Sequence, residues 1–279
     1  MMQALKRSES RGTRLLQQLL QHGKRLFTIE DAALAAEAIP SHQLTKVLSR
    51  LAQQGKLLRL RRGLYLVMGL FDKKPHPFVI ATALTQPSAI SHWSALHHHG
   101  LTEQIPLVVT ASTPNKVLTP SMRKAKTQQT PSTRLHVWEI DGVRYQYITI
   151  QSTHFFGIET LWLDEIFSVS ITDKERTLLD MFIYPKMFGG IGEALGILET
   201  ALDHIHIQKL IDYALHYGKK AVIKRIGWAL EYFGVPAKRL NPLLKVPMDY
   251  YCRLDTSVPP NGPYDKRWKI QNNLIKVKP

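Results

Sequence analysis

The fold is decided by residues 41–67, which read SHQLTKVLSRLAQQGKLLRLRRGLYLV. In the first half, apolar residues recur at i, i+3, i+4 and i+7, the spacing that gives a helix one buried face. They are Leu44, Val47, Leu48 and Leu51. We expect Ser41 to cap this helix and Gly55 to end it in a left-handed conformation. Residues 56–67 then predict two short strands around an Arg62-Gly63 turn, and a helix followed by a basic hairpin is typical of a winged helix-turn-helix.

Two helices are predicted before this stretch. Leucines at 15, 16, 19 and 20 predict an amphipathic helix over residues 13–21 that ends at Gly23. Residues 28–31 resemble a capping box with Asp31 in the acidic position, and the second helix should run on to Ala38. Pro40 stops that helix, because proline disfavours a helical conformation in the residue before it. Three helices and then a hairpin is the order that a winged helix needs.

The exposed face of the third helix supplies the candidate base contacts. In this motif class the second helix of the turn lies in the major groove with its N-terminal part toward the base edges. Groove geometry favours Gln with adenine and Lys or Arg with guanine. The candidates for base edges are Gln43, Thr45 and Lys46. The candidates for phosphate are Ser41, Ser49 and Arg50. Alone, this helix would also fit a plain helical bundle.

The hairpin carries three further cations. Arg59 and Arg61 are two residues apart and share one strand face, while Leu58 and Leu60 share the other. With Arg62 at the tip, the hairpin presents three arginines suited to phosphate or to a narrow minor groove. The alternative is a solvated charged hairpin. The order of helix and hairpin together favours DNA binding.

Composition points to a polyanionic partner. The chain has 279 residues and a formal net charge of +15, which argues for nucleic acid or an anionic membrane surface. Residues 1–67 hold 12 Lys/Arg against 4 Asp/Glu, a net of +8, so the excess is concentrated at the N-terminus. The single cysteine, Cys252, excludes an intrachain disulfide. No signal peptide and no run of 18 apolar residues is visible, so we expect a cytoplasmic protein without a membrane-spanning helix.

A larger domain is predicted to follow the winged helix-turn-helix domain of residues 1–70. Residues 72–77 look like a linker, with two prolines and little apolar content. Short helices are expected at 78–84 and 88–99, strands at 107–111 and 166–171, and a polar loop over 112–134. Residues 135–140 and 143–150 flank Asp141-Gly142, which is a strong hairpin signal.

The rest of this domain, residues 71–279, should be helical and then strand-like. Thr172 is expected to open the helical part with Glu175 at the capping-box position. Helices are predicted at 173–183, 190–202, 207–217 and 219–233. This bundle-like segment extends to residue 244, and a strand-like tail occupies residues 246–279. With mixed strands over 107–171, the fold class is α+β: a winged helix plus a mixed α/β domain.

No catalytic or metal constellation is expected. His97, His98 and His99 splay around a helix rather than lying one turn apart, and no histidine follows His92 by one turn. Residues 173–176 carry the residue types of a nuclease in the wrong order, so we expect Glu175, Arg176 and Asp180 to form a structural ion-pair network instead. We predict no cofactor, no metal and no enzymatic activity. A second basic cluster, Lys219, Lys220, Lys224 and Arg225, fits either a second DNA-facing patch or a solvated face.

Several segments resemble the AbiEi antitoxins of type IV toxin–antitoxin, or abortive-infection, systems. They are RLFTIEDAALAA (25–36), LSRLAQQGKLLRLRRGLYLV (48–67), SAISHWSALHHHGLTEQIP (88–106), ITDKERTLLDMF (171–182), PKMFGGI (185–191) and RLD…GPYDKRWKIQNN (253–273). The resemblance spans nearly the whole chain. The winged-helix part is unspecific, whereas the SHWSALHHHGL and DKERTLLDM segments together are distinctive.

The resemblance implies an autoregulated antitoxin. The winged helix would bind inverted repeats of double-stranded DNA in the promoter of its own operon and repress it. The C-terminal domain would carry the antitoxin activity and counter a nucleotidyltransferase-like toxin without a stable complex. Residues 219–225 are a candidate for the antitoxic surface. Two alternatives stay open: a ligand-responsive regulator without a toxin, and a nuclease targeted to DNA by the winged helix.

Overall fold

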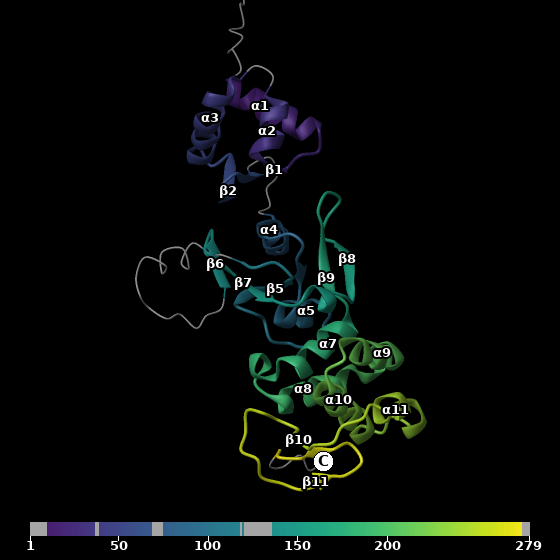
Figure 1. The fold of residues 1–279 in the computed structure, drawn as a ribbon. Helices are drawn as coiled ribbons and strands as arrows, with labels where there is room; N and C mark the ends of the chain where they lie inside the picture. The colour runs from purple at the N-terminus through teal and green to yellow at the C-terminus, as the bar shows by residue number, and fades with distance from the viewer. Residues whose placement is uncertain (1–9, 37–38, 69–74, 118, 120–135, 275–279) are drawn as a thin grey trace, which may run out of the picture. The chain divides into compact units, whose positions relative to one another are not determined.

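The structure, a computed structural model, describes residues 10–36, 39–68, 75–117, 119 and 136–274. The chain divides into two compact units, Met1–Leu84 and Thr85–Pro279 (Figure 1). The predicted domain boundary after residue 70 falls within residues 69–74, which lie outside the described residues. Both units combine helices with sheets, so the α+β class is confirmed.

The first unit is a winged helix. Its helices are α1 (Arg11–Gln21), α2 (Ile29–Ala35), α3 (Ser41–Gln53) and α4 (Pro77–Leu84). Its antiparallel sheet has the order β1 (Leu26–Thr28), β3 (Leu64–Val67), β2 (Leu57–Arg61), so the predicted hairpin is confirmed and the short strand β1 was missed. Leu44, Leu48 and Leu51 are buried with leucines of α1 and with Phe27, as the helical periodicity of α3 requires.

The helix ends of this unit agree with the sequence in two places and differ in two. Thr28 and Asp31 form the expected capping box, in which the Thr28 N–H donates to Asp31 Oδ2 across 2.8 Å. Gly55 is left-handed, with φ +72, where α3 ends. However, Ser41 is the first residue of α3 and Pro40 holds the cap position. The second helix ends at Ala35, before the predicted Ala38, because the chain leaves helical geometry at Ala36.

The second unit is built on a mixed six-stranded sheet. The strands are β6 (His136–Ile140), β7 (Val143–Thr149), β5 (Val108–Thr113), β4 (Ala89–Ile90), β9 (Ser168–Thr172) and β8 (Ile158–Trp162), in that order across the sheet. The Asp141-Gly142 hairpin between β6 and β7 is confirmed, with φ of 50 and 77 at the two turn residues. Positive φ at both positions matches the twist of the flanking strands.

Three predictions for this unit need correction. Residues 88–99 were expected to form one helix, but strand β4 pairs with β5 and β9 before helix α5 (His92–His98) begins. Thr172 is the last residue of β9, and Asp173 caps helix α7 (Lys174–Ile183) by accepting from the Arg176 N–H. The expected loop over 112–134 starts later, because Ser112 and Thr113 belong to β5; residues 118 and 120–134 lie outside the described part.

Helices follow the six-stranded sheet in the sequence and lie below it in the view of Figure 1. They are α7, α8 (Ile191–Ala201), α9 (Ile207–Tyr217), α10 (Lys220–Tyr232) and α11 (Ala237–Leu244). A small sheet with the order β10 (Cys252–Arg253), β12 (Ile270–Gln271), β11 (Tyr264–Asp265) packs on α10. The helix and sheet meet at Gly227 and Trp268, where a Cβ on the glycine would collide with the indole ring. That close approach explains the glycine inside α10.

Candidate DNA interface

The exposed face of α3 is set by the residues that the helix buries. Leu44 and Leu48 are at most 3% exposed, which turns the opposite side of the helix toward solvent. Four predicted contact residues are exposed there: Thr45, Lys46, Ser49 and Arg50. Gln43 is half-buried at the edge of the same face. The side chain of Ser41 lies outside the described part of the chain.

The hairpin places its arginines as the alternation predicts. Arg59 and Arg61 are exposed, Leu60 between them is buried, and Leu58 is half-buried. A bulge between Arg59 and Arg61 shifts the pairing with β3 by one residue, a device that bends and twists an edge strand. Arg62 is exposed in the turn, which Gly63 completes at φ +77. Three guanidinium groups therefore lie within four residues at the end of the wing.

The α3 face and the wing come from a stretch of sequence without acidic residues. Residues 38–71 contain six Lys/Arg and no Asp or Glu. Asp31, an acidic residue before this run, is engaged by the Thr28 cap and by Lys24 Nζ, 3.1 Å from its Oδ1. Glu30, which also precedes this run, is exposed, so the acid-free stretch is confined to α3 and the wing. An excess of positive charge attracts a polyanion and steers its approach. The α3 face and the wing thus combine hydrogen-bonding side chains with phosphate-binding cations.

A residue of α1 that was not predicted from the sequence joins this surface. Arg11 Nη1 donates to Gln43 Oε1 across 3.2 Å, and the Gln43 amide nitrogen lies 3.2 Å from His42 Nε2. These two contacts fix which end of the amide faces which neighbour. Arg11 and Gln43 are 32 residues apart, so no local pattern indicates that they meet.

The second basic cluster is not one surface, which corrects the expectation for Lys219, Lys220, Lys224 and Arg225. Lys224 and Arg225 are 2% and 6% exposed. Lys224 Nζ donates to the carbonyl oxygens of Leu243 and Leu244, and burial lowers the pKa of this lysine. The Arg225 guanidinium donates twice to the Arg253 carbonyl oxygen. These two cations tie α10 to the chain that follows it, and only Lys219 and Lys220 of the four are exposed.

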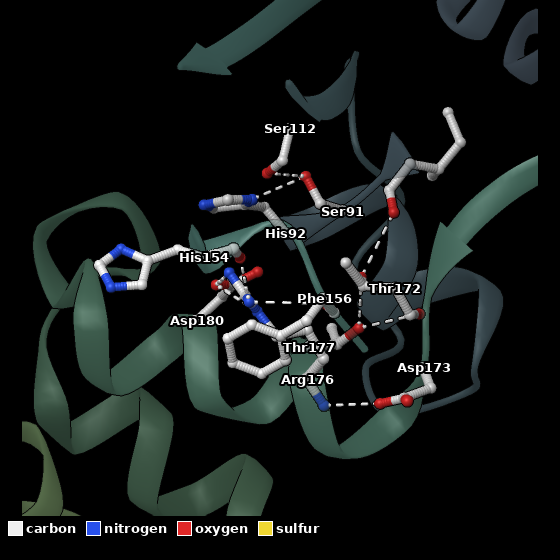
Figure 2. Close-up of polar contacts among 11 residues, drawn as sticks. Ser91, His92, Ser112, His154, Phe156, Thr172, Asp173, Arg176, Thr177 and Asp180 are labelled. Carbon is white, nitrogen blue, oxygen red and sulfur yellow. Dashed lines mark hydrogen bonds and ion pairs between the residues drawn. The ribbon is translucent and has the colours of Figure 1, made fainter. Parts of the chain in front are cut away.

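Residues 173–180 contribute to a buried network of ion pairs and hydrogen bonds, as their residue types predicted (Figure 2). Arg176 Nε and Nη2 donate to Asp180 Oδ1 across 3.2 and 2.9 Å, and Nη1 donates to the His154 carbonyl oxygen across 2.6 Å. Among the residues that the structure describes, none is a hydrogen-bond partner of Asp180 Oδ2, and the Arg176 and Asp180 side chains are 1% and 0% exposed. The pair therefore anchors α7 to the loop before β8.

Glu175 belongs to the same network but points toward α9. Its Oε1 accepts from the His206 N–H across 2.8 Å, and its Oε2 lies 3.2 Å from Lys209 Nζ. Burial alone would raise the pKa of Glu175, but these two contacts outweigh it and lower the pKa. Lys209 also pairs with Asp173 across 3.0 Å. Asp173 and Glu175 therefore each have a structural partner in Lys209.

The histidines of α5 have separate surroundings. His97 and His98 are exposed, whereas His99 Nε2 makes a 2.7 Å hydrogen bond with the Thr172 carbonyl oxygen. His92 is 1% exposed and stacks on Phe188. Among the residues that the structure describes, no three His, Cys, Asp or Glu side chains converge as metal ligands.

Comparison with known proteins decides the type of the first unit. Residues 14–67 match a family model described as a transcriptional regulator, AbiEi antitoxin. The N-terminal domain is of the AbiEi antitoxin type. The match runs from α1 to the end of β3 and so covers both the α3 face and the wing. The AbiEi-type domain is therefore the winged helix-turn-helix of a transcriptional regulator.

A solved structure extends the likeness in fold beyond the AbiEi-type domain. The crystal structure of the RV2827C protein from Mycobacterium tuberculosis matches with a TM-score of 0.63 and 15% sequence identity. The alignment covers 96% of this chain and 93% of that protein, so the fold of both units is shared. No curated protein matches the chain. Within the described residues, no helix has the length and apolar character needed to cross a membrane.

Proposed function

We propose that this protein is the antitoxin of a type IV toxin–antitoxin system and the repressor of its own operon. The observation that carries the proposal is the AbiEi-type domain with an exposed cationic α3 face and a three-arginine wing. Its targets are inverted repeats of double-stranded DNA in its own promoter. The protein acts in the cytoplasm, where that DNA lies.

In the proposed complex, α3 reads bases and the wing supplies affinity. Gln43, Thr45 and Lys46 face base edges in the major groove, in the pairings that the groove favours. Ser41, Ser49 and Arg50 contact phosphate beside them. Arg59, Arg61 and Arg62 bind the backbone or enter a narrow minor groove, where negative potential is strongest. This arrangement is supported by the burial pattern of α3 and by the exposure of all three wing arginines.

The second unit carries the antitoxin activity in this proposal. Its counterpart is a nucleotidyltransferase-like toxin that is countered without a stable protein complex. The support is the family resemblance of residues 88–106 and 171–191, together with the solved structure that shares both units. Catalysis by the second unit is not part of the proposal, because Asp173, Glu175 and Asp180 are engaged in structural contacts.

A reporter experiment tests the two activities separately. The protein's own upstream region drives a reporter, and a nucleotidyltransferase-like toxin gene, taken from beside the chain's own gene if one lies there, is expressed from an inducible promoter. We expect the intact chain to repress the reporter and to restore growth in the presence of the toxin. Arg61→Ala/Arg62→Ala should relieve repression while growth rescue persists. If the intact chain leaves the reporter unchanged, it is not an autorepressor; if growth is not restored, it is not the antitoxin.

A further inference from the structure

Exposed tyrosines gather on the small C-terminal sheet. Tyr250, Tyr251 and Tyr264 are 58%, 39% and 59% exposed. All three lie within a stretch of 15 residues, outside residues 14–67, which match the AbiEi family model. Single exposed aromatic residues are ordinary on protein surfaces, but a group of them marks an interaction site.

The small C-terminal sheet has one face buried against the helices and one face exposed. Cys252, Leu254, Trp268 and Ile270 are buried against the helices. Tyr251, which is exposed, and Lys269, which is half-buried, come directly before the buried residues Cys252 and Ile270. The rings of Tyr251 and Tyr264 meet edge to face, with centroids 4.9 Å apart. Lys269 Nζ lies 5.1 Å from the Tyr251 ring centroid. Two rings and one ammonium group thus share the outer face.

The chain beneath this face is held firmly. The Asn273 amide donates to the carbonyl oxygens of Asp255, Val258 and Pro259. Asp255 Oδ2 accepts from the Ile191 N–H at the start of α8. A Cβ on Gly262, which has φ +133, would collide with the Asn272 carbonyl oxygen. The exposed rings are therefore carried on a rigid support, which lowers the entropic cost of binding to them.

Cations outnumber anions along the segment that carries the rings, since residues 245–274 hold five Lys/Arg and three Asp/Glu. Lys266 is exposed, and Arg267 is 49% exposed while pairing with Glu231 across 3.0 Å. The nearby acids are Asp249, which is exposed, and Asp265, whose Oδ1 accepts from the Trp268 N–H. Protein–protein interfaces deplete charged residues at their centre, whereas aromatic rings among lysines suit unpaired bases and phosphates.

We propose that this face, the tyrosine platform (Tyr251, Tyr264 and Lys269), binds single-stranded nucleic acid, with the exposed Tyr250 and Lys266 next to it in the sequence. Unpaired bases stack on the tyrosine rings and the lysines contact the phosphates between them. In a duplex the base faces are covered by their neighbours, so the platform selects single strands. The proposal does not depend on operator binding, because it uses neither α3 nor the wing.

Fluorescence anisotropy with the full chain tests the platform. The probes are labelled oligouridylate and oligothymidylate of about 12 nucleotides, a length within the usual site sizes. Tyr251→Ala/Tyr264→Ala should bind both probes about 5- to 100-fold more weakly than the unchanged protein. Tyr251→Phe/Tyr264→Phe should keep the affinity, because phenylalanine retains the stacking face. A preference for the RNA probe would indicate contacts with the 2′-hydroxyl.

Two controls separate the platform from the rest of the molecule. Trp162→Ala removes an aromatic side chain that is 67% exposed on β8 and should leave the affinity unchanged. Arg61→Ala/Arg62→Ala should weaken duplex binding while single-strand binding persists, so failure of either proposal is distinguishable from failure of the other. The platform is contradicted if folded Tyr251→Ala/Tyr264→Ala binds both probes like the unchanged protein. It is also contradicted if neither probe binds, whether or not the tyrosines mediate self-association in sedimentation.

Discussion

Arg11 donates from Nη1 to Gln43 Oε1 across 3.2 Å and so connects the first helix of the winged helix to its recognition face. The amide nitrogen of Gln43 meets His42 Nε2 at the same distance of 3.2 Å. An amide held at both ends is pre-oriented, and orientation is what a bidentate contact with adenine demands.

Replacing Arg11 should therefore weaken specific binding more than non-specific binding. We expect Arg11→Ala to lower affinity for the operator by about 3- to 10-fold, part of the discrimination that a bidentate pair supplies. Arg11→Lys keeps the charge but loses the planar fork, so it should restore non-specific affinity without restoring specificity. The measurement is anisotropy on operator and scrambled duplexes. Equal losses on both duplexes in Arg11→Ala would show that Arg11 acts only through its charge.

Gln43 itself should set preference at a single base pair. Gln43→Ala should reduce discrimination at one operator position by about 5- to 100-fold, because a bidentate contact to adenine is lost. Binding to a panel of operators with one base pair changed locates that position. Gln53→Ala, an exposed residue near the end of the same helix, is the matched control and should change nothing. A uniform loss across the panel would remove Gln43 from base readout.

The buried pair of Arg176 and Asp180 should dominate the stability of the second unit. Asp180→Ala leaves an uncompensated buried guanidinium, and we expect a loss of about 3–5 kcal/mol in the free energy of unfolding. Arg176→Met/Asp180→Leu should recover much of this loss, since replacing both partners removes the stranded charge. Arg267→Ala breaks an exposed pair with Glu231 and should cost at most about 1 kcal/mol. Urea unfolding measures all three. A cost for Asp180→Ala no larger than that of Arg267→Ala would contradict the role given to the network.

Acidification should destabilise the second unit through His92. Burial lowers the pKa of His92, nearby Asp180 opposes that shift and Arg176 adds to it. Because the folded pKa lies below the unfolded value, the unfolded chain binds the proton first. The stability from neutral His92 is then present above about pH 6.5 and is lost as the pH falls below it.

His92→Asn should shrink this pH effect. Asparagine tolerates the positive φ of 55 found at His92, and it does not titrate. The fall in urea midpoint between about pH 7.5 and about pH 5.5, which brackets the usual histidine pKa, should be smaller than in the unchanged protein. Part of the fall should persist, because the pKa of His154 is also lowered, chiefly by burial. An unchanged fall in His92→Asn would exclude His92, and His97→Asn at the exposed end of α5 is the control.

The features predicted correctly from the sequence are those that depend on residues close together in the chain. Helical periodicity located α3, Asp141-Gly142 located a hairpin, and the Thr28 cap opened α2, because each depends on residues within one or two turns of each other. The prediction of one helix over residues 88–99 was wrong, because a short buried strand and a helix can have the same apolar composition. β4 is a strand only through its pairing with β5 and β9, which lie elsewhere in the chain.

Local sequence patterns also failed to predict which charged side chains are buried. Lys224 and Arg225 find their acceptors at residues 243, 244 and 253, so their sequence neighbourhood resembles an exposed basic patch. The link between Arg11 and Gln43 was missed for the same reason. By contrast, the wing arginines were placed correctly, because strand alternation alone decides which of residues 58–61 face solvent.

The central claim is that the AbiEi-type domain binds its own upstream DNA through α3 and the wing. A salt titration of the full chain on that duplex, compared with Arg61→Ala/Arg62→Ala and with Lys219→Ala/Lys220→Ala, tests it most directly. Each variant removes two exposed cations, one pair from the wing and one from the second unit. Affinity should fall steeply with salt, and the wing variant should bind more weakly with a slope lower by about two. The Lys219→Ala/Lys220→Ala variant should behave like the unchanged protein. An unchanged affinity and slope in the wing variant would contradict the account.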